Sequence, residues 1–302
     1  MKPLIIIGGA TGTGKSDIAV ACAKKLNGEI ISTDSMQIYR GLDIGTAKIT
    51  PKEMGGIPHY MIDVVDASES FTAAEYKIRA IECINDILER GKVPILCGGT
   101  GLYINAVLYD MTFSGAFDAD LRQKLLEERK EKGKEYMHAR LASLDPAVAA
   151  KLHVNDEKRV IRAIEKALTG GKEETDLAQA KYPYLMFVTD IPRDVMYERI
   201  EKRVDKMMLS GLKAEVMGLL AAGVGFDKQC MQAIAYKEWA NYLTGEMTEE
   251  EVVALIKKNT RNYAKRQVTW FKQYKDAVKI SVLDRSADDI AEDISKRYNE
   301  AV

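Results

Sequence analysis

The sequence predicts an α/β fold, with a parallel sheet flanked by helices and an all-helical subdomain inserted into the chain. Short apolar runs alternate with helical patterns through much of the 302 residues, as is typical of parallel sheets. A glycine-rich loop joins the first apolar run to the first helical pattern. Between Asp118 and Lys172 the sequence is helical and highly charged, without strand signals. We therefore assign residues 1–113 and 183–302 to the α/β core and residues 114–182 to the helical insertion.

The loop near the start of the chain indicates phosphate binding. It follows the apolar run 4–7 and fits the pattern G-x-x-x-x-G-K-[ST], with Gly9, Ala10, Thr11, Gly12, Thr13, Gly14, Lys15 and Ser16. The glycines let backbone N–H groups turn toward an anion, and the following helix N-terminus adds partial positive charge. Lys15 supplies a full charge and Ser16 a hydroxyl for Mg²⁺. The sequence thus predicts a P-loop NTPase-like core that binds a di- or triphosphate, carried by a molecule that the motif does not identify.

Two further strands bring polar residues to this loop. Residues 29–32 and 94–97 are predicted strands, and they are followed by Asp34 and Thr100, respectively. Ligands of parallel α/β sheets bind outside the carboxyl ends of the strands. We therefore expect Asp34 and Thr100 to lie close to the phosphate loop.

The other core elements follow from local patterns. The expected elements are a polar loop with glycine hinges at 41–48, a strand at 58–63, a helix from a capping box at Thr72 to about Arg90, a strand at 184–190, a long helix capped at Thr248 and reaching about Tyr274, a last strand at 278–283 and a final acidic helix. The strand at 184–190 returns the chain to the sheet after the insertion.

Composition bounds the functional class. The formal net charge of −1 gives no global basic field, so any nucleic-acid site must be a local patch. Four scattered cysteines without C-x-x-C spacing are typical of buried thiols in a reducing cytosol. Apolar runs fall short of the roughly 20 residues that span a bilayer, and because the first strand begins almost at Met1 we expect no signal peptide. We expect a cytoplasmic protein without a membrane partner.

The long helix near the C-terminus carries a local basic patch. Its cations are Lys257, Lys258, Arg261, Lys265, Arg266, Lys272 and Lys275, with no acidic residue between the first and the last. Tyr263, Trp270 and Tyr274 fall on one stripe of the same helix. One interpretation is an amphipathic helix with aromatics in the core and cations in water. The other is a surface for a polyanion partner.

Taken in order, several blocks of the sequence resemble the tRNA dimethylallyltransferase family, also called tRNA isopentenyltransferases. The likeness covers nearly the whole chain and includes the phosphate loop, residues 34–39, 44–48, 58–60, 98–103 and 153–156, Arg159, Arg162, and residues 232–238 and 260–271. The sequence departs from the family pattern at Ala10 and Val154, where the family usually has Pro, and at Ala235, where it usually has Gly.

The resemblance implies transfer of a dimethylallyl group from its diphosphate to N6 of the adenine just 3′ of a tRNA anticodon. Asp34 would be the general base, Thr100 would hold the diphosphate or its bridging oxygen, and Lys15 and Mg²⁺ at Ser16 would bind the diphosphate. The residues expected to contact tRNA are Asp34, Ser35, Met36, Gln37, Thr100, Arg122, Lys158, Arg159, Arg162, Gln232, Lys265 and Arg266. We expect a monomer whose partners are the tRNA anticodon stem-loop and dimethylallyl diphosphate.

Three alternatives use the same loop. A P-loop nucleotide or nucleoside kinase would bind ATP and use Asp34 as base toward a hydroxyl, but it leaves the basic helix and the insertion unexplained. A nucleotide-binding switch or nucleic-acid-binding module would perform no transfer chemistry. A prenyltransferase acting on free adenine nucleotides would have little use for the basic tract.

Overall fold

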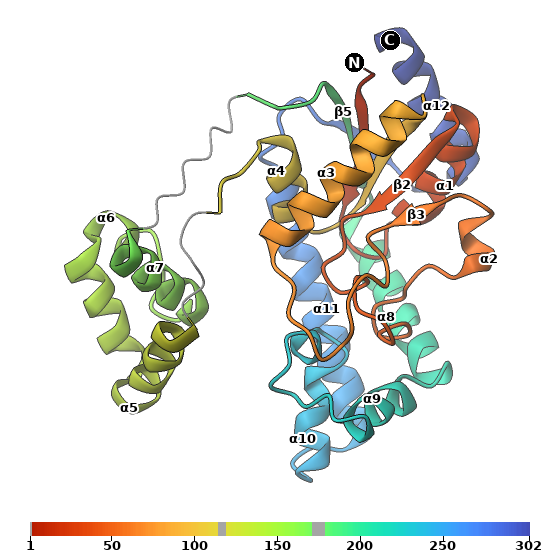
Figure 1. Cartoon of the computed structure of the whole chain (residues 1–302). Helices are drawn as coiled ribbons and strands as arrows, with labels where there is room; N and C mark the ends of the chain where they lie inside the picture. The colour runs from red at the N-terminus through yellow and green to blue at the C-terminus, as the bar shows by residue number, and fades with distance from the viewer. Residues whose placement is uncertain (1, 114–118, 171–178) are drawn as a thin grey trace. The chain divides into compact units, whose positions relative to one another are not determined.

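The computed structural model describes residues 2–113, 119–170 and 179–302, and it confirms the predicted α/β class. Six parallel strands form one sheet in the order β3-β2-β4-β1-β5-β6 (Figure 1). Their bounds are Leu4–Gly9 for β1, Gly28–Ser32 for β2, His59–Tyr60 for β3, Val93–Gly98 for β4, Tyr184–Asp190 for β5 and Val278–Ser281 for β6. Because all strands run the same way, their carboxyl ends meet at one edge.

The central strand explains why the sheet forms here. Every residue of β1 is buried, as expected for a strand covered by helices on both faces. It pairs with β4 on one side, where Gly8 lies opposite Gly98, and with β5 on the other, where Gly9 lies opposite Thr189. Strand β3 is shorter than the predicted strand at 58–63 because Met61 (φ 62°) and Asp63 (φ 54°) adopt left-handed turn conformations.

Helices cover both faces of the sheet. On one face, α1 (Lys15–Leu26) and α12 (Ala287–Ala301) pack over β1 and β4, and Ile18 and Ile294 lie in the same cluster as Ile5 and Ile95. The other face is covered by α3 (Ala73–Glu89), α4 (Gly101–Leu108) and the C-terminal part of α11 (Glu249–Phe271). This arrangement leaves the carboxyl edge of the sheet open to the segments that form the site.

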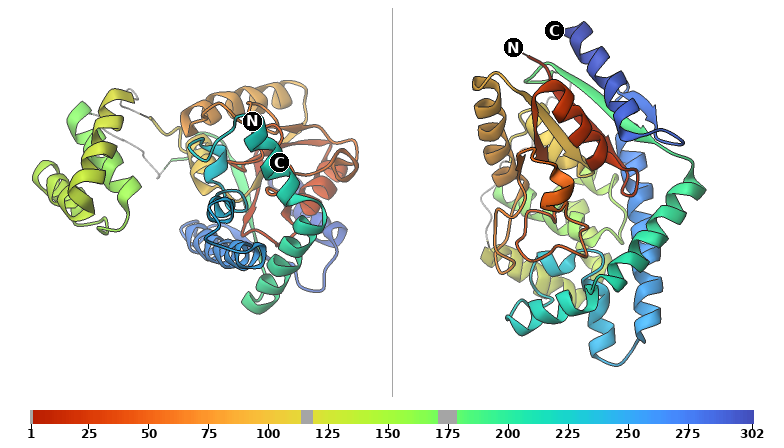
Figure 2. Two further views of the ribbon diagram at one scale, coloured as in Figure 1. Left: turned by 90° about the horizontal axis from the view of Figure 1, so that it is seen from below. Right: turned by 90° about the vertical axis from the view of Figure 1, so that its right-hand side faces the viewer.

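Most of the remaining helices of this unit extend past the carboxyl edge of the sheet (Figures 1 and 2). They are α8 (Arg193–Leu209), α9 (Leu212–Ala221), the 3₁₀ turns η1 (Cys230–Gln232) and η2 (Lys237–Trp239), and α10 (Ala240–Leu243). The N-terminal part of α11 lies among them, so α11 joins this lobe to the sheet. The short helix α2 (Pro51–Met54) instead lies beside α1, where its C-cap Gly55 faces Val20 and Lys24.

Residues 111–177 form a second compact unit, separate from residues 1–110 and 178–302. Its described helices are α5 (Ala119–Leu144), which Gly133 breaks with φ 83°, α6 (Pro146–Ala149) and α7 (Glu157–Thr169). Its own core includes Leu125, Leu141 and Ile164. The unit ends before the predicted boundary at 182 because Tyr182 packs in the core of the α/β unit. In the part of the chain that the structure describes, no helix is long and apolar enough to cross a membrane.

Candidate active site

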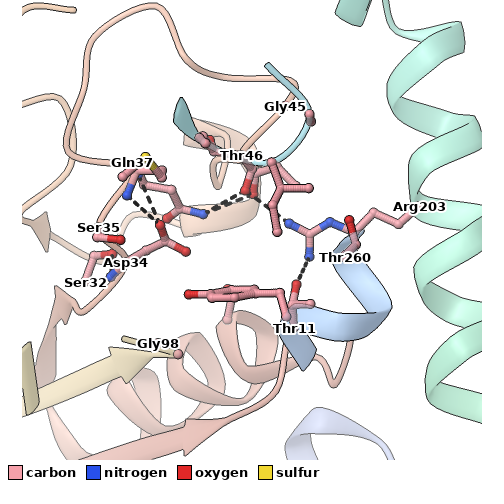
Figure 3. Close-up of a pocket in the computed structure, with 18 of the residues that line it drawn as sticks. Thr11, Ser32, Asp34, Ser35, Gln37, Gly45, Thr46, Gly98, Arg203 and Thr260 are labelled. Atoms are coloured by element: carbon pink, nitrogen blue, oxygen red, sulfur yellow. Dashed lines mark hydrogen bonds between the residues drawn. The ribbon is translucent and has the colours of Figure 1, made fainter. Parts of the chain in front are cut away.

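A cavity of about 380 Å³ lies at the carboxyl edge of the sheet (Figure 3). The loop after β1, the segment after β2, the end of β4, α8, residues 232–237 and α11 all contribute to its lining. The predicted residues that line it are Thr11, Lys15, Ser16, Asp34, Ser35, Met36, Gln37, Gln232 and Arg266. The structure thus brings the phosphate loop and Asp34 to one cavity, as the strand-end argument predicts.

The phosphate loop is held in a closed turn. Gly12 (φ 81°) and Gly14 (φ 79°) take left-handed conformations that favour glycine. The Thr13 hydroxyl donates to the Ala10 carbonyl at 2.9 Å and lies 2.7 Å from the Thr189 hydroxyl on β5. Thr13 is therefore a structural residue that anchors the loop to the sheet, while Thr11, Lys15 and Ser16 face the cavity.

Lys15 is a half-buried cation whose charge is poorly compensated within the protein. Its Nζ donates to the Ala10 carbonyl of the same loop at 2.5 Å. Burial lowers the pKa of Lys15 from 10.5 to about 8, and the nearby Arg203 guanidinium adds to this effect, while Cys97 and Asp34 oppose it. An anion in the cavity would relieve this cost, because it would interact favourably with a desolvated ammonium group.

Arg203 is the main site residue that the sequence analysis missed. It reaches from α8 into the cavity, where Nη1 donates to the Thr11 hydroxyl at 3.2 Å and Nη2 to the Thr46 carbonyl at 3.1 Å (Figure 3). Burial lowers the pKa of Arg203, and no carboxylate of the described residues lies within ion-pairing distance. Two half-buried cations, Lys15 and Arg203, thus face one cavity, which favours a multiply charged anion.

One signal for Arg203 was present in the sequence. Met196, Ile200, Val204 and Met207 are the buried residues of α8, and Arg203 lies within this apolar stripe. An arginine on the buried side of an amphipathic helix is unusual, because burying a guanidinium is costly unless it has a function or a partner.

Asp34 organises the segment that follows β2. Its Oδ1 accepts the backbone N–H of Met36 at 2.8 Å and that of Gln37 at 3.3 Å. The Ser35 N–H donates to the Thr100 hydroxyl at 3.2 Å, and the Thr100 N–H donates to the Thr33 carbonyl at 3.1 Å. The second carboxylate oxygen of Asp34 makes no hydrogen bond with the described residues, so it is free to accept a proton from a ligand.

Thr100 does not line the cavity but contacts a residue that does. The cavity is lined by Gly98 and Gly99, whereas Thr100 is the N-cap of α4. Its hydroxyl fixes Ser35 from the end of the neighbouring strand. The contact between Thr100 and a diphosphate or its bridging oxygen stays a prediction.

Helix α11 contributes one wall of the cavity. Tyr263 and Arg266 line it, with the Arg266 guanidinium 5.6 Å from the Tyr263 ring centre. Burial and the charge of Asp34 raise the pKa of Tyr263 to about 12, so this phenol keeps its proton near neutral pH. Gln267 accepts the Thr11 N–H and donates to the Gly99 carbonyl, which connects both loops to the helix.

The basic tract of α11 is less positive in the fold than in the sequence. Lys257 pairs with Asp205 at 2.6 Å and Arg261 with Glu201 at 2.5 Å, both from α8. Lys265 lies over the ring of Tyr197 at 5.8 Å. Lys258, Lys272 and Lys275 are exposed. The cations therefore divide between helix packing and a surface that remains available to a polyanion.

The four predicted cations of the second unit differ in their surroundings. Arg122 and Arg162 both donate to the buried Glu165 carboxylate, at 3.1–3.2 Å and 3.2 Å. Arg159 is 69% exposed and pairs with Asp156 at 3.0 Å, and Lys158 is exposed. Arg122 and Arg162 thus help to hold α5 and α7 together, whereas Lys158 and Arg159 face solvent.

The residues present fit a magnesium ion that is bound together with a diphosphate. No group of three or more histidine, cysteine, aspartate or glutamate residues forms a metal site in the described ranges. Mg²⁺ commonly takes only one or two protein oxygens and completes its shell with phosphates and water. The Ser16 hydroxyl at the cavity wall meets that requirement.

Comparisons with known proteins agree with this geometry. The profile of the family described as IPP transferase matches residues 37–274. A protein of Thermoanaerobacter sp. (strain X514) named tRNA dimethylallyltransferase is 46% identical over 280 residues, or 90% of this chain and 89% of that one. The structure of the full-length tRNA isopentenylpyrophosphate transferase of Bacillus halodurans matches with a TM-score of 0.76 at 41% identity, over 99% of this chain and 98% of that chain.

A third comparison extends to a more distant relative. The structure of a eukaryotic dimethylallyltransferase acting on tRNA matches with a TM-score of 0.84 at 29% identity, over 100% of this chain and 80% of that chain. The similarity covers both the α/β unit and the insertion, and it includes the segments that line the cavity. This chain therefore belongs to the IPP transferase family.

Proposed function

We propose that this protein transfers the dimethylallyl group of dimethylallyl diphosphate to N6 of the adenine immediately 3′ of the anticodon in tRNAs, giving N6-isopentenyladenosine and diphosphate. One observation carries the proposal. Two half-buried cations, Lys15 and Arg203, face the same cavity as the carboxylate of Asp34. A reaction that expels an anion at one end and releases a proton at the other needs this arrangement.

The diphosphate end would be formed by the phosphate loop and Arg203. The loop amides, the Lys15 ammonium and the Arg203 guanidinium would hold the donor and stabilise the charge that develops as the C1–O bond breaks. The electron pair of that bond leaves with the diphosphate. Mg²⁺ at Ser16 would share the negative charge of the leaving group.

The acceptor end would be formed by the segment after β2. The adenine must leave its base stack to enter a cavity of this kind. As N6 forms its bond to C1 of the donor, the free oxygen of Asp34 takes the N6 proton, while its other oxygen keeps the 34–37 turn in place. Ser35, Met36, Gln37, Gln232 and Arg266 would contact the base and its neighbours.

The backbone of the tRNA would be bound by exposed cations. Lys265 on α11 and Lys158 and Arg159 on the second unit have the exposure that phosphate contacts require. Arg122 and Arg162 would contribute while they remain bonded to Glu165. We further propose that the enzyme acts as a cytoplasmic monomer with the anticodon stem-loop as its partner.

The test measures which acceptor receives the prenyl group from a labelled donor. Radiolabelled dimethylallyl diphosphate is incubated with the protein and unmodified tRNA, AMP or no acceptor, with ATP hydrolysis measured in parallel. Label that appears only in tRNA, and that is lost in the Lys15→Ala variant, is the expected result. Label in AMP would favour the free-nucleotide prenyltransferase, and ATP turnover without prenyl transfer would favour the kinase. The names of the relatives support transfer to tRNA over the kinase alternative.

A further inference from the structure

A carboxylate outside the cavity fixes the loop that precedes α2. Glu215 on α9 accepts three successive backbone N–H groups, with Oε2 bonded to Asp43 at 3.0 Å and to Ile44 at 2.7 Å, and Oε1 to Gly45 at 3.0 Å. Consecutive N–H groups that converge on one anion form a nest, which is otherwise a site for a bound phosphate or carboxylate ligand. Here the protein supplies the anion itself.

Tyr236 contacts both Glu215 and the loop that Glu215 binds. The Tyr236 phenol donates to Glu215 Oε1 at 2.5 Å, and burial raises the pKa of this phenol well above its ordinary range. The Tyr236 ring packs against Gly45, where an added Cβ would lie 2.5 Å from a ring carbon. Glu215 therefore receives four hydrogen bonds, and Gly45 has no room to move toward the ring.

The far end of the loop is anchored as well. Lys48 has a side chain that is 6% exposed, and its Nζ binds the Tyr39 carbonyl, Asp43 and Asp63. The segment 43–48 is thus fixed at both ends, although the glycines at 41 and 45 predicted hinges. We call this segment, residues 43–48, the strap; its residues 45–47 line the cavity.

This strap presents one backbone carbonyl to two cavity residues. The Thr46 carbonyl accepts Arg203 Nη2 at 3.1 Å and Gln37 Nε2 at 3.3 Å (Figure 3). Arg203 is then held between this carbonyl and the Thr11 hydroxyl of the phosphate loop. We propose that Glu215 is a positioning residue for the prenyl donor, which acts through the Thr46 carbonyl to hold Arg203 toward the diphosphate.

The inference rests on the proposed function, since it assigns Arg203 to the diphosphate. A carboxylate is required at position 215 because each oxygen accepts two donors. In Glu215→Gln one oxygen becomes an NH₂ group, which faces N–H donors and cannot accept them. Residues 43–46 then lose part of their anchor, and Arg203 loses the carbonyl that orients it.

The test measures binding of inorganic diphosphate to the full chain by calorimetry, in the presence of Mg²⁺. The variants are Glu215→Gln, Arg203→Ala and the double variant, with melting temperatures recorded for each. Lys213→Met is the matched control, because Lys213 lies on the same helix and makes an ion pair with Glu249 that does not touch the strap. We expect Glu215→Gln to weaken diphosphate binding about tenfold and the control to leave it unchanged.

The double variant separates positioning from general stability. If Glu215 acts through Arg203, removing both weakens binding no more than Arg203→Ala does, because interacting residues have non-additive effects. Additive losses would overturn the inference, as would Glu215→Gln binding within twofold of wild type while Arg203→Ala is impaired. If Glu215→Gln does not fold, Tyr236→Phe takes its place: it removes one of the four donors, and the same non-additivity is expected.

Failure of the proposed function has a different signature. A wild-type protein that binds no diphosphate would remove the function of the cavity and this inference with it. An Arg203→Ala variant that binds diphosphate as well as wild type does would remove this inference alone, because the phosphate loop and Lys15 would still bind the donor. In transfer assays, Glu215→Gln is expected to raise the KM for dimethylallyl diphosphate while leaving the Kd for tRNA within twofold. A loss of tRNA affinity as large as the loss of donor affinity would contradict positioning.

Discussion

The side-chain amide of Gln267 accepts the backbone N–H of Thr11 at 2.9 Å, which connects the long helix α11 directly to the phosphate loop. Its Nε2 donates to the Gly99 carbonyl at 3.1 Å, and the residue is buried. In Gln267→Glu the second bond is lost, and a negative charge is placed beside the loop. We expect diphosphate affinity to fall at least tenfold in calorimetry, because like charge opposes the anion and a buried acceptor loses its donor, at a cost of about 1–3 kcal/mol.

Gln273→Glu is the control for this change. Gln273 is exposed and lies just beyond the end of α11, so the same substitution there adds the same charge without touching either loop. Equal diphosphate affinities for Gln267→Glu and wild type would show that the amide bridge does not shape the phosphate site.

The role of Asp34 as general base is tested better by Asp34→Asn than by Asp34→Ala. Asp34→Asn keeps an oxygen that can accept the Met36 and Gln37 N–H groups, so the turn after β2 survives while the proton acceptor is lost. We expect single-turnover transfer to fall by roughly 10²–10⁴ with tRNA affinity within a few-fold. Asp34→Ala should lose the turn as well, and its tRNA affinity should suffer more. More than about a tenth of the wild-type rate in Asp34→Asn would remove this residue from the role of base.

The pKa of Lys15 makes donor binding depend on pH. Because this pKa is about 8 in the free protein, the ammonium that a diphosphate needs is lost as the pH rises above that value. Binding should therefore be flat below pH 8 and weaken by up to tenfold for each further unit. Lys15→Arg should remove the decline, since arginine keeps its charge throughout the range. Calorimetry from pH 7 to 10 measures both, and a wild-type affinity that is constant up to pH 10 would contradict a titrating Lys15.

Lys15 also makes the stability of the protein depend on pH, but in the opposite direction to donor binding. Its folded-state pKa of about 8 lies below the ordinary 10.5, so between these values the unfolded chain binds more protons than the folded protein. The contribution of Lys15 to the free energy of unfolding therefore rises as the pH increases from 8 to 10.5. The wild-type protein should gain this stability relative to Lys15→Met over that window in urea titrations.

The residues that the sequence predicted are those whose position follows from local pattern. The phosphate loop is one contiguous motif, and Asp34 follows a strand whose carboxyl end had to face that loop. The apolar stripe of α8 marks Arg203 as unusual, but its place at the site required the tertiary structure, because the Thr46 carbonyl and the Thr11 hydroxyl orient it from distant segments. The partial neutralisation of α11 was also hidden, since Asp205 and Glu201 come from another helix.

In the second unit, Arg122 and Arg159 should behave differently. Arg122→Gln leaves the buried Glu165 carboxylate with Arg162 as its remaining cation among the described residues. Because the Arg122 side chain is itself 34% exposed, we expect the free energy of unfolding to fall by about 1–3 kcal/mol, less than for a fully buried ion pair. Amide exchange in α7 should rise in this variant and stay unchanged in Arg159→Gln. Equal exchange in both variants would show that the Arg122–Glu165 pair does not hold the helices together.

The cations of α11 predict a specific dependence on salt. If Lys265 and Arg266 contact phosphates, changing both to Gln should weaken the binding of all tRNAs to the protein about equally. It should also flatten the slope of log K against log salt by roughly two contacts, each about 0.7–0.9. Lys257→Gln with Arg261→Gln is the matched control, because it removes the same charge from cations that α8 already neutralises. The control should leave the slope nearly unchanged.

The two single variants add a distinction, because the side chains lie on different sides of the helix. Lys265 lies over Tyr197 at the α8 side, whereas Arg266 lines the cavity. Lys265→Gln should therefore reduce the slope of log K against log salt by one contact and leave donor binding unchanged. Arg266→Gln should reduce this slope and also the rate of transfer. If Arg266 instead only anchors the helix, its variant would lose melting temperature together with both activities. An unchanged slope with normal melting in the double variant would show that this helix does not bind nucleic acid.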